Sequence, residues 1–186
     1  MNKLTLLEKK WKRLELPFAF YHTTFVENAP LILKEQKITA NKGESICREK
    51  NGVVSLSDRI TEGIVEFFGN VVFELDAVSL FKKNKLTIPR DYEISEDYAD
   101  KYDELPFFEN EWVVPGELKF DLEDINKVLL ITSRDFKKST FENVICILES
   151  KDIEYCLLSE KWLPDNIFPD ITRYFFRIEN WSEFVK

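Results

Sequence analysis

The chain has 186 residues, enough for one domain with a full hydrophobic core, whereas two domains would each be small. Hydrophobic residues make up 44% and Phe occupies 16 positions, so disorder is not expected. The five glycines form neither G-x-G-x-x-G nor G-x-x-x-x-G-K-[ST], and a net charge of −8 argues against a broad phosphate-binding surface.

Cysteine and histidine usage excludes a zinc framework and a disulfide scaffold. Cys47, Cys146 and Cys156 lie far apart, and the chain has one histidine. No run of about 18 apolar residues or secretory leader is apparent. We therefore expect a reduced, cytoplasmic protein with no metal site and no membrane association.

The first part of the chain predicts a helix, a strand and a second helix. Apolar residues recur at helical spacing over residues 3–14, which indicates an amphipathic helix that ends before Pro17. Residues 16–21 predict a strand that ends at the polar triplet His22-Thr23-Thr24. A helix should open near Asn28, because a proline follows in its first turn.

The middle of the chain predicts alternating loops, strands and short helices. Residues 37–51 are polar and predict a loop that could cover a site. Residues 52–58 predict a strand that stops at helix-capping residues, so residues 59–68 should form a helix. A strong strand is expected at residues 70–75 and a further strand at residues 125–132.

The later segments complete one α+β domain. Residues 107–115 look extended, residues 135–142 suggest a helix, and residues 153–158 resemble a strand, while residues 144–148 fit either a strand or an apolar helix. We expect a single domain over residues 1–186: an N-terminal helix (1–16), a core (17–132) and a segment completing sheet and helices (133–186).

Three polar features stand at strand ends and could converge. These are His22-Thr23, Ser55-Leu56-Ser57, and the pair Glu109 and Glu111, whose spacing puts both carboxylates on one face of a strand. Apolar neighbours would partly desolvate a carboxylate there, which is typical of site residues. The plainer alternatives are a structural histidine bonded to a carbonyl and a solvent-facing strand edge.

Taken in chain order, these residues resemble the ADP-ribosyltransferase superfamily, in particular its bacterial and phage branch that includes DNA-targeting toxins. The resemblance is carried by Tyr21-His22-Thr23-Thr24 with Asn28 and Leu31-Ile32-Leu33-Lys34, by Val53 to Arg59, and by Glu109 to Val114. It spans about residues 20–131 and implies a split, mostly antiparallel sheet with flanking helices. Gln36-Lys37-Ile38 replaces the usual Gly-Leu after the helix.

The resemblance implies a role for each residue around NAD, which is the substrate of such enzymes. Glu111 would hold a ribose hydroxyl and stabilise an oxocarbenium-like state, and Glu109 would position or deprotonate the acceptor. The remaining candidates would bind NAD: His22 a ribose hydroxyl, Thr23 the nicotinamide half, Ser55 and Ser57 the cleft floor, Arg59 the pyrophosphate, and Phe68 the nicotinamide ring. His22 and Glu111 should then face each other across one cleft.

The acceptor class stays open at this stage. A protein or a single-stranded nucleic acid base fits the acidic composition, and an antitoxin or inhibitor protein is a further possible partner. An inactive protein of the same fold, acting through a protein partner, is the main alternative. A metal-dependent hydrolase using the acidic cluster within residues 93–104 is the weakest alternative, because no histidine accompanies the cluster.

Overall fold

A six-stranded sheet forms the centre of the protein. The computed structural model describes residues 5–14, 16–40, 52–84, 86, 111–133 and 136–163. Strands run in the order β5-β3-β1-β4-β7-β8, antiparallel except for the β7–β8 pair. Their bounds are β1 Ala19–Thr24, β3 Val53–Ser57, β4 Val71–Asp76, β5 Glu111–Pro115, β7 Ile125–Thr132 and β8 Tyr155–Ser159. The predicted mostly antiparallel sheet is confirmed.

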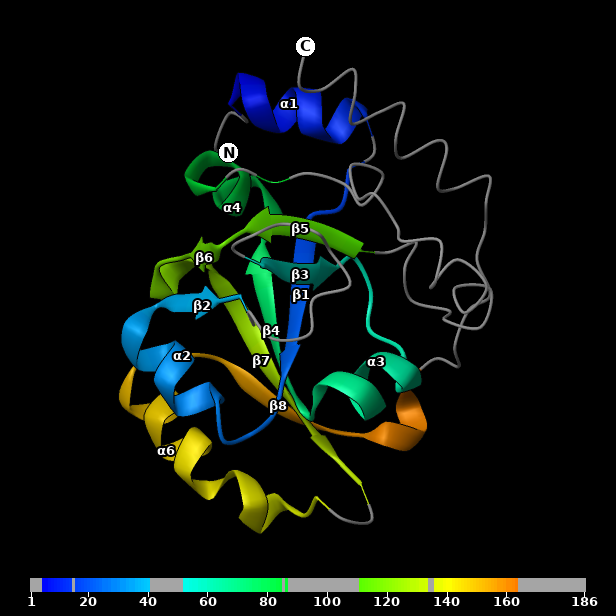
Figure 1. The fold of residues 1–186 in the computed structure, drawn as a ribbon, viewed down its shortest axis with the longest axis vertical. Coiled ribbons are helices and arrows are strands. Elements are labelled where there is room, and N and C mark those ends of the chain that lie inside the picture. Colours follow the sequence, from blue (N-terminus) through cyan, green and yellow to red (C-terminus); the bar gives the residue numbers. More distant parts are fainter. Residues whose placement is uncertain are drawn as a thin grey trace.

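Helices cover both faces of this sheet, and a small second sheet pairs β2 (Lys37–Thr39) with β6 (Glu117–Lys119). The helices are α1 Leu6–Arg13, α2 Ala29–Glu35, α3 Glu62–Phe68, α4 Ala77–Lys83 and α6 Glu142–Ser150, with 3₁₀ turns η3 Leu122–Asp124, η4 Lys138–Phe141 and η5 Glu160–Trp162. In Figure 1, α2 and α6 lie on one side of β1, β4 and β7, and α3 lies on the other.

Each face of the sheet has its own hydrophobic cluster. The larger cluster joins the strands to α1, α2, α4 and α6 through residues such as Phe20, Phe73 and Leu148. The smaller one, Val72, Leu129 and Ile131, lies on the opposite face, where Val65 of α3 packs against it. Successive residues of a strand point to opposite faces, so Phe20, His22 and Thr24 share the larger-core face while Tyr21 and Thr23 share the α3 face.

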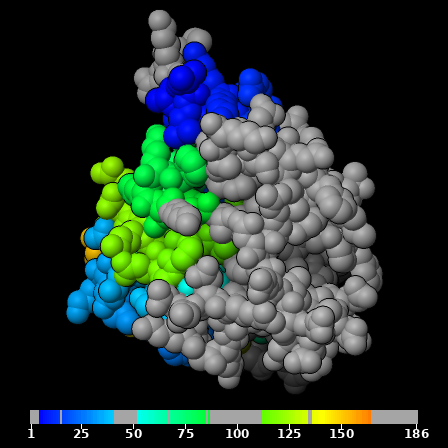
Figure 2. All heavy atoms as spheres, turned by 45° about the horizontal axis from the view of Figure 1, so that its top comes forward, coloured from blue at the N-terminus to red at the C-terminus, as the bar shows by residue number. Residues whose placement is uncertain are grey.

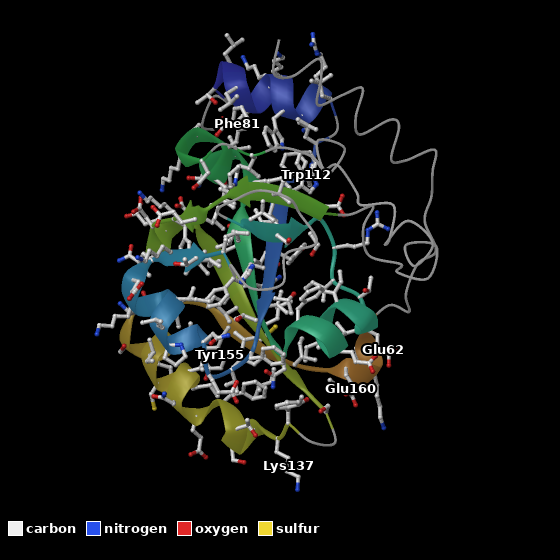
Figure 3. The ribbon with its side chains drawn as sticks, in the orientation of Figure 1. Glu62, Phe81, Trp112, Lys137, Tyr155 and Glu160 are labelled. Atoms are coloured by element: carbon white, nitrogen blue, oxygen red, sulfur yellow. The ribbon has the colours of Figure 1, made fainter. Side chains whose placement is uncertain are left out.

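Four aromatic side chains tie α1 and α4 to the strands, and we call them the aromatic brace: Trp11, Phe20, Phe81 and Trp112. The ring of Trp11 lies 5.6 Å from that of Phe81 and 6.5 Å from that of Phe20, which in turn lies 5.1 Å from Trp112. The indole N–H of Trp11 also donates to the Pro17 carbonyl at 2.8 Å. Figure 2 shows α1 against α4 at this end of the molecule, and Figure 3 shows Phe81 and Trp112 beneath α1.

Several expectations from sequence need correction. The N-cap of α3 is Thr61, because Ser57 belongs to the β3 ladder. Residues 37–39 form β2 rather than a loop, because they pair with β6. Of the two alternatives for residues 144–148, the helix is confirmed, because they lie within α6. The extended segment expected over residues 107–115 is described only from residue 111, where it forms β5, an end strand of the six-stranded sheet.

Candidate active site at a split in the sheet

The sheet divides between β1 and β3. These strands register a single pair, Tyr21 with Ser57, whereas β1 pairs with β4 at six positions and β3 with β5 at five. In Figure 1, β3 and β5 run across the direction of β1 and β4. Past the single pair, Thr23 is registered only with Val72 of β4 and Ser55 only with Val113 of β5, so the strand edges of β1 and β3 that face each other have no further registered pairs. Polar backbone groups on such edges need other partners, and a ligand can supply them.

His22 bridges the two strands where they begin to part. Its Nδ1 lies 3.1 Å from the backbone oxygen of Ser55. A carbonyl oxygen only accepts hydrogen bonds, so Nδ1 must carry the proton and Nε2 is left as an acceptor when the ring is neutral. Burial lowers the pKa of His22 from 6.5 to about 4, although the bond to Ser55 opposes the shift. The imidazole is therefore neutral at physiological pH and offers Nε2 to a hydroxyl donor.

A continuous row of polar residues crosses five strands at this level, and we call it the polar row. The registered pairs are Glu111 with Ser57, Ser57 with Tyr21, Tyr21 with Glu74, and Glu74 with Lys127. Directly opposed residues share a face, with Cβ atoms about 5 Å apart. The row thus joins the position of Glu111 to the centre of the sheet.

Side-chain contacts link three residues of the polar row: Tyr21, Glu74 and Lys127. Lys127 Nζ lies 3.3 Å from Glu74 Oε2, and the Tyr21 hydroxyl hydrogen-bonds Glu74. Burial and the Glu74 charge raise the pKa of Tyr21, so its hydroxyl stays protonated and donates to that carboxylate. The sequence did not indicate a role in the site for Tyr21 or Glu74. Strand alternation alone would have placed Tyr21 on the face of the sheet opposite His22.

The predicted serines and threonine lie at the split. Ser57 is buried and its hydroxyl is 3.5 Å from the Tyr21 carbonyl, which makes a weak bond. Ser55 is exposed and contributes its carbonyl to His22. The Thr23 hydroxyl is buried on the α3 face. These positions are consistent with lining a site, and their roles stay predictions.

The other predicted residues are less well grouped. Arg59 is paired with Asp58, with 3.3 Å between Nε and Oδ1, so its guanidinium is not held ready for a pyrophosphate. Phe68 is exposed at the last position of α3. Glu109 lies outside the described residues, and Glu111 is the first residue of β5.

His22 and Glu111 occupy positions on opposite faces of the sheet. His22 alternates with Tyr21, and Tyr21 shares its face with Ser57 and Glu111. A ligand resting on one face would reach only one of the two. Their meeting across one cleft stays a prediction.

Within the described part of the chain, no group of three or more His, Cys, Asp or Glu side chains could hold a metal ion. The acidic cluster of residues 93–104 lies outside that part. None of the described helices is both long and apolar enough to cross a bilayer. Cys146 and Cys156 are free thiols, both exposed.

No protein-family model matches this sequence, and no curated protein matches it either. Three solved structures of Thermus sp. 2.9 DarT are similar in fold: complexes with carba-NAD+, NAD+ and ADP-ribosylated ssDNA. Each match has a TM-score of 0.49 at 12–13% identity, covers 79% of this chain, and covers 96–98% of the DarT chain. Similarity of this degree assigns no activity to the present chain.

Proposed function

We propose that this chain transfers ADP-ribose from NAD to a macromolecular acceptor, either a protein or a nucleic acid base. The observation that carries the proposal is the split between β1 and β3. The neutral imidazole of His22 bonds Ser55 at this split, and the Glu111 position pairs with Ser57 one strand further on. In this proposal His22 supplies the hydroxyl acceptor and Glu111 the carboxylate that a ribosyl transfer needs.

In the proposed reaction the bond between the ribose C1′ and the nicotinamide nitrogen breaks, and nicotinamide leaves with the bonding electrons. Positive charge develops on the ribose, and a carboxylate fixed beside it stabilises that charge. Glu111 takes this role while binding a ribose hydroxyl, and the Nε2 of His22 accepts from a second hydroxyl. Thr23 borders the nicotinamide end, and Ser55 and Ser57 form the floor.

The acceptor nucleophile then bonds to C1′ and gives up its proton. Glu109 is the proposed group that takes the proton. In this proposal Arg59 must exchange Asp58 for the pyrophosphate, and Phe68 must turn toward the nicotinamide ring. The Arg59–Asp58 pair is also the observation that favours the second candidate, a protein of this fold that binds a partner, such as an inhibitor protein, without turnover.

The test is transfer of label from adenylate-labelled NAD in cell extract. Glu111→Gln should reduce labelling by about 100-fold or more, because the amide carries no charge to stabilise the developing cation. Glu117→Gln, on the neighbouring strand β6 and paired with Lys119, is the matched control and should label like wild type. Protease and nuclease digestion of the product identifies the acceptor class.

Equal labelling by wild type and Glu111→Gln would contradict the proposed role of that carboxylate. Calorimetry with NAD at millimolar concentration supplies the second arm. Wild-type protein that shows neither heat of binding nor label transfer would support the non-catalytic candidate instead.

A further inference from the structure

Two side chains beneath α3 hold polar atoms that lack partners in the described part of the structure. Asn70 is 3% exposed, and neither its amide oxygen nor its amide nitrogen has a hydrogen-bond partner. The hydroxyl of Thr23 is likewise buried without a partner. Buried polar groups are nearly always paired, so three such atoms call for an explanation.

The two residues lie near each other along the register of β1 and β4. Thr23 pairs with Val72, and Asn70 comes two residues before Val72, directly before β4 begins at Val71, so extending the register would make the two residues diagonal neighbours. The Asn70 carbonyl accepts from the Ile131 amide at 2.8 Å, which fixes its backbone against β7. Gly69 lets the backbone before Asn70 approach the end of β1 closely, because a Cβ at position 69 would lie 2.4 Å from the backbone of Thr24 and Phe25.

This location adjoins the proposed nicotinamide end of the site. Thr23 belongs to the strand that parts from β3, and the smaller hydrophobic cluster beside it, with Ile60 and Val65 packed on it, supplies apolar surroundings. A primary amide presents one donor edge and one acceptor edge in a single plane, and the matching group is another planar amide. Nicotinamide combines an apolar ring with such an amide.

We propose that Asn70, assisted by the Thr23 hydroxyl, recognises the carboxamide of nicotinamide and so selects the dinucleotide. The inference rests on the proposed function. The Asn70 nitrogen donates to the ligand carbonyl, and its oxygen accepts from the ligand amide nitrogen. Since the atoms are enclosed here, the ring must displace side chains that cover this face, among them Ile60 and Val65.

The test compares binding of NAD with binding of its 3-acetylpyridine analogue, in which a methyl group replaces the amide nitrogen. Wild type should prefer NAD by roughly tenfold or more, because the analogue leaves the Asn70 oxygen unpaired. Asn70→Leu, similar in size, should bring the preference within about twofold. The same variant should raise the Tm by roughly 2–6 °C, because it removes two unpaired buried polar atoms.

Asn84→Leu is the matched control. Asn84 is fully engaged, with bonds to the Leu80 carbonyl and to both backbone groups of Lys119. Its replacement should lower the Tm and leave the preference for NAD unchanged. Thr23→Val, which removes only the hydroxyl, should weaken the preference while keeping the fold.

The outcomes separate this inference from the function on which it rests. If wild type binds neither dinucleotide, the proposed function fails and takes this inference with it. If wild type binds NAD and Asn70→Leu keeps the same preference, the Asn70 inference alone is overturned. In that case the two side chains take no part in recognising the nicotinamide carboxamide.

Discussion

The protonation of His22 gives the most direct test of the site. The shift of its pKa from 6.5 to about 4 means that the folded protein resists protonating the imidazole. At about 1.4 kcal/mol per pKa unit, the folded state favours the neutral ring by about 3 kcal/mol. Between these two pKa values the unfolded chain binds the proton and the folded chain does not, so acidification removes stability.

Linkage gives the size of the effect. Taking 6.5 for the unfolded chain and 4 for the folded one, about 2.5 kcal/mol is lost between pH 7.5 and pH 4.5, and the loss is complete below about pH 4. His22→Asn is the perturbation, because its amide nitrogen can still donate to the Ser55 carbonyl but does not titrate. The stability difference between wild type and variant should therefore shrink by about 2.5 kcal/mol as the pH falls.

Denaturant unfolding monitored by Trp fluorescence measures this difference at each pH, and carboxylates shared by both proteins cancel. Because the chain has one histidine, its ring resonance in an NMR titration is unambiguous. A midpoint near 6.5, or a stability difference that is constant over this range, would refute the neutral, half-buried imidazole and with it the proposed hydroxyl contact.

Three further predictions concern the frame around the site. Trp112→Leu should cost about 2–3 kcal/mol in denaturant unfolding and lower kcat, because Trp112 meets Phe20 at 5.1 Å beside Glu111; Trp162→Leu, 79% exposed, should change neither. Gly69→Ala should cost about 3 kcal/mol or prevent folding, since φ is +115° and the new Cβ would strike backbone; a wild-type melting curve would contradict this. Burial opposes ionisation of Asp124, but hydrogen bonds from Lys83 and Ser79 outweigh burial and lower the pKa of its carboxyl group. Asp124→Asn should therefore lower the free energy of unfolding by about 2 kcal/mol at pH 7. The loss should be smaller below pH 3.8, the ordinary pKa of this group, because the wild-type carboxylate is then protonated in the unfolded chain. Asp121→Asn, whose side chain is 69% exposed, is its control and should cost about 0.5 kcal/mol or less.

Elements with strong local signals were predictable. The apolar runs of β4 and β7 leave little choice but buried strands, and Asn28 with the following proline marks the start of α2. The strand β2 was not predictable, because three residues in a polar stretch become a strand only by pairing with β6. The parallel docking of β8 on β7 was missed for the same reason.

For the candidate site too, residues with a local sequence signal were predictable and those brought together by strand pairing were not. Residue types at strand ends pointed to His22 and Ser57, and both border the split. The register of separate strands is a tertiary property, so no local pattern could reveal that Tyr21, Ser57 and Glu111 lie in one row. Asn70 gave no signal of a binding role, since the sequence pattern indicated only the start of the strand expected over residues 70–75.

The aromatic brace has a practical consequence at the other end of the chain. Trp11 belongs to the first helix, yet through Phe20 its ring sets where Trp112, and hence the start of β5, comes to rest. A fragment that begins at β1 lacks Trp11, whose ring packs against Phe20. Expression boundaries for this protein therefore belong upstream of Thr5, even though every proposed substrate contact lies beyond residue 20.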